Sequence, residues 1–398
     1  MNNFLTNFIS EKIQEAAIIA HLAAYNAQLK IEELTFINKP VAIKYKTTQL
    51  SKPPTTKPPI SKSSINKPLV TIIMTYFNRK TQTRLTFDNF EKMYANKYNI
   101  EVIIVDDSSY ENENLQKLIF EYSFRIKLVE LKEKHWINPV VPTNIAITHI
   151  NPLTELVIIQ NPEILHSGDV IGHALNIVTP ENYITYPIFN SPHFKYNKQL
   201  QKLFNKGKTN FYKNFVKKID YRLFDFDQKF YEEKYPDVAA HKFDEKESYE
   251  YFMKYDKNQG RVCNRSGIFF PRIMVYKCKG WLNHHEYEDR SFHYLGAMKK
   301  STLDEIGGFC NEMKDGLWYD DNEFINRIKR VKQVIIPTVQ DVMGIHQFHE
   351  QGTYMHRYIK NSEQLKARNE KIMKDTYFKG VIYCDPRNDV KEEVFMNY

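Results

Sequence analysis

The chain has 398 residues, of which 42% are hydrophobic and 14% aromatic, so it can build a substantial core and is not globally disordered. Its formal charge of +8 comes from 56 basic and 48 acidic residues, a balance that suits an anionic ligand. With no long basic run and no recognised motif, the sequence excludes a dedicated nucleic-acid-binding protein. The four cysteines are widely spaced and form no Cys-x-x-Cys pair, so they indicate neither a zinc knuckle nor a disulfide framework.

Residues 1–40 are predicted to form an amphipathic helix. The segment has no basic start and carries Glu11 and Glu15, so it is not a secretory signal. It could pair with a partner or with its own copy, or it could pack on the rest of the chain. No stretch reaches the roughly 20 apolar residues of a membrane span. We therefore expect a soluble, cytoplasmic protein, in a host cytoplasm or a virion if the source is viral.

Residues 41–67 are rich in Pro, Ser, Thr and Lys, which favours an extended and solvated linker. The first large domain should therefore begin at about residue 68.

Two apolar, β-branched runs follow, over residues 70–78 and 101–109, and each ends in a polar turn. Apolar residues at helical spacing lie between them, so the segment is predicted to be a strand, a crossover helix and a second strand. Ligands of open α/β sheets bind beyond the carboxyl ends of the strands. We therefore expect the turns Thr75-Tyr76-Phe77-Asn78 and Asp106-Asp107-Ser108-Ser109 to meet at a ligand site. Two acids after a strand could also do no more than cap the next helix.

These turns resemble the opening signature of the family 2 glycosyltransferases, enzymes of the GT-A fold that use nucleotide-activated sugars. The resemblance implies an α/β fold over residues 68–350, with a Rossmann-like mixed sheet flanked by helices. It also implies that the Thr/Tyr turn flanks the base of the nucleotide and that the acids of the second turn bind uracil and ribose. The nucleotide-binding residues implied in this way are Thr75, Tyr76, Phe77, Asn78, Asp106, Asp107, Asn138 and Asn144.

A third apolar strand, within residues 156–169, ends in Gln160-Asn161-Pro162-Glu163. In the GT-A fold, an Asp-x-Asp motif at this place holds a divalent metal against the donor diphosphate. Here Asn161 and Glu163 replace the two acids, which keeps two oxygen ligands and loses one negative charge.

A helical insertion is predicted at about residues 220–265, where aromatic residues recur at helical spacing and Gly260 serves as a helix stop. After it, His284, His285 and His293 invite a metal interpretation but lack zinc spacing, so they are interpreted as surface or acceptor-loop residues.

The segment Leu317–Phe324 (LWYDDNEF) resembles the family pattern in which an acid at the start of a helix acts as the general base. The resemblance implies that this base is Asp321, the second acid of the pair. A sugar hydroxyl is a poor nucleophile, and a positioned carboxylate can take its proton. Asp320 and Glu323 would support it on acceptor hydroxyls, and Trp318 would stack on an acceptor sugar. Acids in a first helical turn are also common as caps alone.

Further on, His346 and His349 lie three residues apart and could flank one site, or could be hydrogen-bonded loop residues. The resemblance implies that His346 is a further metal ligand, which would compensate for the weakened Asn161 and Glu163 pair and suit Mn2+ or Mg2+. Residues 351–398 are predicted to form a polar helix, which could cover the donor, and a loose tail after Asp385.

The sequence therefore predicts an inverting glycosyltransferase that moves a sugar from a UDP-sugar to a hydroxyl of a glycan or glycoprotein, in glycan biosynthesis. One alternative is a non-catalytic protein of the same fold that binds a nucleotide sugar or a glycan. A nucleotidyltransferase is a third class, which usually carries a Gly-rich basic loop that Asn78-Arg79-Lys80 matches poorly.

Overall fold

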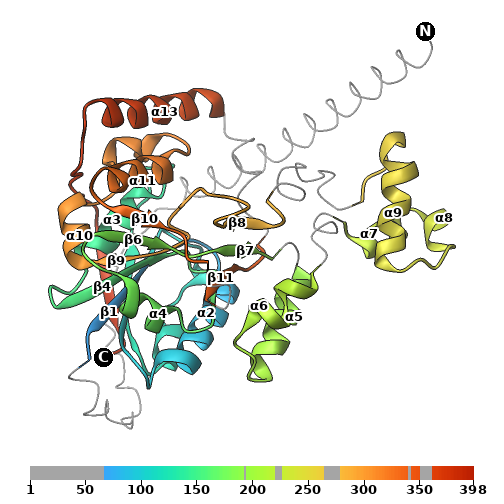
Figure 1. Ribbon diagram of the computed structural model, residues 1–398, viewed down its shortest axis with the longest axis horizontal. Helices are drawn as coiled ribbons and strands as arrows, with labels where there is room; N and C mark the ends of the chain where they lie inside the picture. The colour runs from blue at the N-terminus through green and yellow to red at the C-terminus, as the bar shows by residue number, and fades with distance from the viewer. Residues whose placement is uncertain (1–66, 192–193, 220–225, 264–277, 339–341, 350–360) are drawn as a thin grey trace, which may run out of the picture. The chain divides into compact units, whose positions relative to one another are not determined.

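This computed structural model describes residues 67–191, 194–219, 226–263, 278–338, 342–349 and 361–398 of the chain (Figure 1). The predicted helix over residues 1–40 and the predicted linker up to residue 66 lie outside the described residues.

The strands are β1 (Leu69–Tyr76), β2 (Asn99–Asp106), β3 (Arg125–Leu131), β4 (Thr154–Gln160), β5 (Ile164–Ser167), β6 (Asn182–Thr185), β7 (Ile188–Asn190), β8 (Trp281–Asn283), β9 (Leu295–Lys299), β10 (Gln333–Ile335), β11 (Met343–His346) and β12 (Glu392–Met396). The α-helices are α2 (Lys80–Tyr94), α3 (Val140–Thr148), α4 (Val170–Ile177), α5 (Phe194–Asn205), α6 (Phe211–Asn214), α7 (Gln228–Lys234), α8 (Pro236–Ala239), α9 (Glu245–Tyr251), α10 (Lys300–Ile306), α11 (Asp320–Val331) and α13 (Ser362–Phe378). Short helical turns are η2 (Glu111–Glu113), η3 (Leu118–Glu121), η4 (Val216–Lys218), η6 (Phe252–Asp256), η7 (Lys257–Gln259) and η9 (Asn311–Asp315).

These strands form two sheets. The larger has the order β10-β6-β9-β4-β1-β2-β3-β12, and the smaller has the order β5-β11-β7-β8. In the larger sheet β1 runs parallel to β2 and β4, whereas β9 and β12 run antiparallel to their neighbours. The predicted α/β class, with a mixed sheet flanked by helices, is therefore confirmed (Figure 1).

The central strands are apolar throughout because both faces of the sheet are covered. Along β1, Val70, Ile72 and Met74 belong to the core that includes α2 and α4, whereas Ile73 faces the core that includes α3, α10 and α11. This alternation is the two-residue period of a strand. The predicted crossover helix is also present as α2, and Phe87, Phe90 and Tyr94 are its large buried residues in the first of these cores.

The smaller sheet supports its own cluster of aromatic residues. Residues of α5 and α6 pack against β7, β8 and β11 there, and Trp281, Phe189 and Ile345 are among the buried strand residues. The cluster packs α5 and α6 against the smaller sheet, whose strand β11 ends at His346.

The helical character predicted for the insertion is present in α7, α8 and α9, which enclose a separate aromatic core. Tyr231, Tyr249 and Phe252 are buried in it, whereas Tyr255 is 44% exposed. Gly260 ends the last turn at φ +76°, which confirms it as a helix stop.

The tail after Asp385 is not loose, contrary to the sequence interpretation. It forms β12, which pairs with β3 at the edge of the larger sheet. The buried amide of Asn397 fixes it there, because its Oδ1 accepts from the Ile126 amide at 2.8 Å and its Nδ2 donates to the Ile119 carbonyl at 2.8 Å. Its short mixed sequence, EEVFM, carries a weak strand signal, and β3 supplies the pairing edge.

Helix α11 is fixed by a buried ion pair. Glu323 and Arg327 are spaced by one helical turn, and the Glu323 carboxylate accepts two bonds from Arg327, of 2.7 Å from Nε and 3.0 Å from Nη2. The guanidinium also donates to the carbonyls of Ile306 and Gly308, so it ties α11 to the end of α10. Both side chains are at most 2% exposed.

We expect Arg327→Ala to lower the free energy of unfolding by about 3–5 kcal/mol, because it leaves the Glu323 carboxylate buried without a partner. Urea denaturation measures the change. The exposed neighbour Lys329 supplies the control, since Lys329→Ala should alter stability by about 0.5 kcal/mol or less. An equal loss in both variants would contradict the buried ion pair as an anchor.

Candidate active site

A pocket of about 260 Å³ opens at the carboxyl ends of the parallel strands β1, β2 and β4. This is the edge at which open α/β sheets bind ligands. The predicted site residues that line it are Thr75, Tyr76, Phe77, Asp107, Asn161, Asp320 and Asp321. Arg79, Pro139, Thr143, Pro162, His293 and Tyr294 also line it and were not among the predicted residues.

The turn after β1 is locked to the turn after β2. Asn78, in the left-handed region at φ +50°, accepts a bond from the Tyr110 amide through its Oδ1 at 2.9 Å. Its own amide donates to Ser109 Oγ at 3.0 Å. Asp106 caps this second turn, since its Oδ1 accepts from the Ser109 amide at 2.9 Å. Asn78 and Asp106 therefore shape the pocket edge without lining it.

Asp107 is the acid of the second turn that reaches the pocket. Its Oδ1 accepts from Trp136 Nε1 at 2.8 Å, and its Oδ2 accepts from Lys134 Nζ at 2.5 Å. Burial raises the pKa of Asp107, and the Lys134 charge opposes that rise. Lys134 also lies 4.4 Å from the centre of the Phe77 ring, so one wall combines an aromatic face, an acid and a cation.

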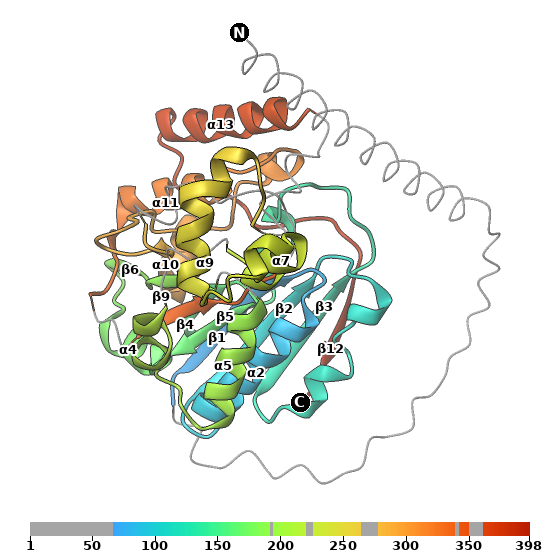
Figure 2. The same ribbon diagram turned by 90° about the vertical axis from the view of Figure 1, so that its right-hand side faces the viewer.

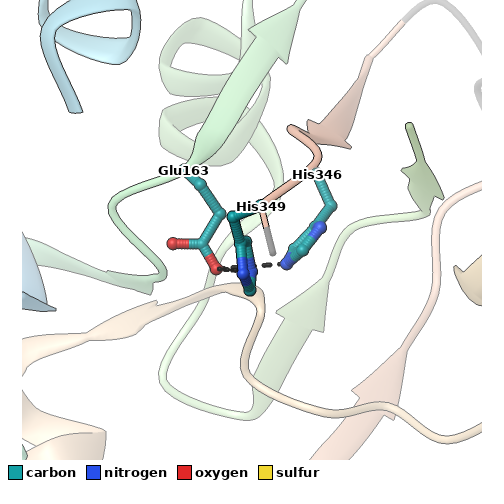
Figure 3. Close-up of side chains that lie close together, drawn as sticks. All are labelled: Glu163, His346 and His349. Atoms are coloured by element: carbon teal, nitrogen blue, oxygen red, sulfur yellow. Dashed lines mark ion pairs between the residues drawn. The ribbon is translucent and has the colours of Figure 1, made fainter. Parts of the chain in front are cut away.

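The second part of the site is centred on the carboxylate of Glu163. It lies in the turn between β4 and β5 and is fully buried, while His346 ends β11 and His349 follows three residues later. The two imidazole Nε2 atoms lie 3.1 Å and 3.5 Å from Glu163 Oε1 and converge on it (Figure 3). Arg79, just before α2, places its Nη1 2.8 Å from the same oxygen.

The charges around Glu163 decide its protonation. Burial alone would raise its pKa, but Arg79, His346 and His349 outweigh burial and hold the pKa of Glu163 well below its usual range. Burial lowers the pKa of His349 despite the nearby carboxylate, which favours a neutral imidazole there. An ionised carboxylate beside neutral imidazole is the form that binds a transition metal.

The residues also fit a metal sterically. Glu163, His346 and His349 each offer one ligand atom, and these atoms lie within 4.8 Å of one another. The oxygen that faces the imidazoles is Oε1, which Arg79 also contacts, whereas Oε2 is buried without a hydrogen bond and points away from them (Figure 3). Of the predicted ligands, Glu163 and His346 therefore come together, and His349 joins them.

Asn161 lies beside this group as a hydrogen-bond donor. Its Nδ2 donates to Glu163 Oε1 at 3.3 Å, and the residue also lines the pocket. His349, which the sequence indicated by its spacing from His346, offers a ring nitrogen to the same group.

The acids at the start of α11 form the third part of the site. Trp318 and Tyr319 both adopt left-handed backbone, at φ +62° and +65°, and so turn the chain into the helix. Such conformations cost of the order of 1–3 kcal/mol each and persist where the surrounding structure fixes them. This turn brings Asp320 and Asp321 to the pocket.

Asp320 and Asp321 have different partners. Asn138 Nδ2 donates to Asp320 Oδ1 at 2.9 Å. Burial, reinforced by the charge of Asp321, raises the pKa of Asp320 to about 6, against the hydrogen bond from Asn138. Asp321 Oδ1 lies 2.6 Å from His293 Nδ1, a close ion pair in which the ring N–H is not aligned as a hydrogen bond.

Packing and charge both act on the imidazole of His293. Its ring contacts Phe309 edge-on at 4.7 Å between centres, which fixes its orientation. Burial lowers its pKa, but Asp321 outweighs burial, so the pKa of His293 is raised overall. The sequence grouped His293 with His284 and His285, because nothing local marks its contact with α11.

Eight predicted site residues do not line this pocket: Asn78, Asp106, Asn138, Glu163 and His346, which are described above, and also Asn144, Glu323 and Trp318. Asn144 is fully buried on α3, where Oδ1 accepts from the Phe309 amide at 2.7 Å and Nδ2 donates to the Phe309 carbonyl at 2.9 Å. Glu323 is held by Arg327 in the buried ion pair. Trp318 is 45% exposed, and Lys366 Nζ lies 4.3 Å from the centre of its ring.

A second group, His284, His285 and Glu286, also has three potential ligand atoms within 4.8 Å of one another. His284 Nδ1 accepts a bond from the Glu286 amide at 3.1 Å, so a neutral ring carries its proton on Nε2. That tautomer cannot bind a metal through Nε2, and this group fits a metal poorly.

Within the described ranges, every helix is too short or too polar to cross a membrane.

No protein-family model matches the chain. No curated protein matches its sequence.

Several solved glycosyltransferases are similar in structure. One is the mannosyltransferase PcManGT from Pyrobaculum calidifontis in complex with GDP-Man and Mn2+, at 13% identity and a TM-score of 0.38, over 79% of this chain and 70% of that one. Another is GalNAc-T7 with UDP, GalNAc and Mn2+, at 11% identity and a TM-score of 0.42, over 79% and 51% of the two chains. TarS of S. aureus is similar at 11% identity and a TM-score of 0.38, over 78% and 43%. At this level of similarity, the activity has to be derived from this chain's own residues.

We expect purified protein to bind Mn2+, and Glu163→Gln to weaken that binding by at least about tenfold, because the carboxylate is the charged ligand of the group. Calorimetric titration measures the affinity. His284→Gln with His285→Gln is the matched control and should bind Mn2+ as the wild type does. Equal losses in both proteins, or none in Glu163→Gln, would contradict the site.

Proposed function

We propose that the protein is an inverting glycosyltransferase, which moves a sugar from a UDP-sugar to a hydroxyl of a glycan or glycoprotein. The observation that carries this proposal is the single pocket that Phe77, Asp107, Asn161, Asp320 and Asp321 line together. The pocket supplies an aromatic and acidic wall and an acid pair. Glu163, His346 and His349 do not line it, but Arg79 and Asn161 do, and both contact Glu163. Together these are the three parts that transfer from a nucleotide sugar needs.

The donor half would lie over β1, β2 and β4. Phe77 offers a flat face to a base, and Asp107 offers carboxylate oxygens for base or ribose groups, with Lys134 and Trp136 orienting that carboxylate. Arg79 lines the pocket beside Glu163 and brings a fixed positive charge to where a diphosphate would lie. A divalent cation, Mn2+ or Mg2+, held by Glu163, His346 and His349 would neutralise charge on the leaving diphosphate.

The acceptor half would lie against the start of α11. Asp321 takes the proton of the acceptor hydroxyl, whose oxygen then attacks the anomeric carbon as the bond to UDP breaks. His293 fixes the Asp321 carboxylate, and Asp320 adds a second acid held by Asn138. Of the carboxylates that line the pocket, Asp107 belongs to the donor half, just after β2. This leaves one acid pair, which suits the single displacement of an inverting enzyme.

A non-catalytic nucleotide-sugar or glycan-binding protein is the second candidate. The observation in its favour is the Arg79–Glu163 ion pair, which by itself supplies a positive charge to the buried carboxylate. Turnover decides between the two candidates, because a binding protein would hold the donor without releasing UDP.

We expect the purified protein to release UDP from one member of a UDP-sugar panel with Mn2+ present, and EDTA to suppress that release. Asp321→Asn should lower kcat by about 10²- to 10⁴-fold, the usual contribution of a general base, while donor affinity stays unchanged. Asp375→Asn, at an exposed position of α13, is the control and should turn over as the wild type does. Donor binding without UDP release in any of these proteins would favour the non-catalytic candidate.

The acid pair also predicts a pH dependence. Because the pKa of Asp320 is raised to about 6, the pair keeps a proton below that pH and activity should fall there. The hydrogen bond from Asn138 lowers this pKa, so its removal in Asn138→Ala should move the acidic limb of the kcat/KM profile to higher pH. An acidic limb that stays in place would remove Asp320 from the reaction.

A further inference from the structure

The positive charge of the chain is concentrated on one surface. Residues 194–218, which form α5, α6 and η4, contain eight lysines and no acidic residue. The other 48 basic residues are matched by the 48 acidic ones, so this segment accounts for the whole formal charge of +8. Its lysines are Lys195, Lys198, Lys202, Lys206, Lys208, Lys213, Lys217 and Lys218.

The lysines are held at the surface by the burial of the opposite side of these helices. Leu200, Phe204 and Phe215 enter the aromatic cluster of the smaller sheet, whereas seven of the eight lysines are exposed. Helices α5 and α6 lie next to one another beyond β7 and β11 (Figure 1). Figure 2, which views the molecule from the side, shows α5 beside β5 of the smaller sheet, and both contribute residues to this cluster.

A pocket of about 440 Å³ is hollowed into this surface. Lys202, Lys206 and Lys218 line it, together with the amides of Gln199 and Asn214. None of these three lysines forms an ion pair with any residue that the structure describes. The one acid at the pocket, Glu245, is already held by Lys195. The pocket therefore presents three uncompensated cations and neutral donors, which is the chemistry of an anion site.

The same segment is joined to the candidate active site. The Ser191 amide, just before α5, donates to the His346 carbonyl at 2.8 Å. Asn197 of α5 donates to the Phe348 carbonyl at 2.8 Å and accepts from the Phe348 amide at 2.9 Å. The basic helices are thus fixed to the segment that carries His346 and His349.

We propose that this lysine pocket binds phosphate or carboxylate groups of an extended, anionic glycan acceptor. This inference rests on the proposed function and names the class of its acceptor. An extended polymer can place one unit at Asp321 while charged groups elsewhere along it contact the lysines. Phosphate and carboxylate are the two anionic groups that a lysine recognises in the same way, as a point charge.

A membrane surface fits the same charge less well. A helix that lies on a bilayer keeps its apolar side chains free to enter the lipid, whereas here they are buried against the smaller sheet. Among the described residues of α5, α6 and η4, Phe194 is the large hydrophobic side chain with high exposure, at 40%. A hollow between lysines also suits an inserted anionic group better than a flat array of lipid headgroups.

The test uses the full-length protein with saturating UDP, so that the donor pocket cannot take up the probe. The probe is polygalacturonate, and its methyl ester is a matched polymer without the charge. We expect calorimetry or light scattering to show binding of the acid form alone, weakening as salt rises. Lys202→Gln, Lys206→Gln and Lys218→Gln combined should weaken it by at least about tenfold, because three exposed cations are removed.

The control removes three exposed lysines elsewhere, in Lys117→Gln, Lys371→Gln and Lys379→Gln, and should bind as the wild type does. Unchanged binding in the pocket variant, or equal binding of the methyl ester, would overturn the proposal. So would anionic lipid vesicles that bind more tightly than polygalacturonate and lose binding in the pocket variant.

The two proposals fail differently. If the wild type turns over a UDP-sugar but does not bind polygalacturonate, the lysine pocket is refuted and the transferase stands. If it binds polygalacturonate through the pocket but turns over no nucleotide sugar, the transferase is refuted, and the acceptor role with it.

Discussion

A single buried negative charge, on Glu163, organises the functional end of this protein. An ionised carboxylate without partners would cost several kcal/mol in the interior, so the fold has to bring cations or donors to it. It does so from two other parts of the chain: Arg79 before α2, and the segment that carries His346 at the end of β11 and His349 after it. The two sheets therefore meet at this carboxylate, because Glu163 lies between β4 of the larger sheet and β5 of the smaller one. The same requirement makes the corner suitable for a divalent cation, since one carboxylate oxygen and two imidazole nitrogens converge there.

The other side of the pocket depends on a strained backbone turn that the surrounding structure stabilises. Two consecutive residues in left-handed backbone, Trp318 and Tyr319, turn the chain so that Asp320 and Asp321 project from the start of α11. The buried Glu323–Arg327 pair anchors the same helix to the carbonyls of Ile306 and Gly308, at the end of α10 and just beyond it. Stability and chemistry are thus divided within one helix. Its first residues line the pocket, and the next turn supplies the anchor.

The sequence predicts best what depends on local pattern. The β1–α2–β2 unit and the turns at its strand ends follow from apolar periodicity, and Asp321 follows from a motif at a helix start. What it misses depends on contacts between distant segments. Arg79 and Glu163 are 84 residues apart, and no spacing rule links them. His293 could not be separated from its neighbours His284 and His285 until α11 was placed beside it. By contrast, the structural role of Glu323 had a local signal, because Arg327 lies at i+4 and two such residues share one helix face.

The central claim is that Glu163, His346 and His349 hold a metal next to a bound nucleotide diphosphate. Pulsed electron paramagnetic resonance of the protein with Mn2+ and UDP tests this most directly, because it detects the nuclei coupled to the metal. The account predicts 14N couplings from the two imidazoles and 31P couplings from the diphosphate in the same sample, with the 14N signal lost when both histidines are changed to glutamine. Mn2+ that shows 31P couplings but no 14N couplings would place the metal on the nucleotide alone and contradict the account.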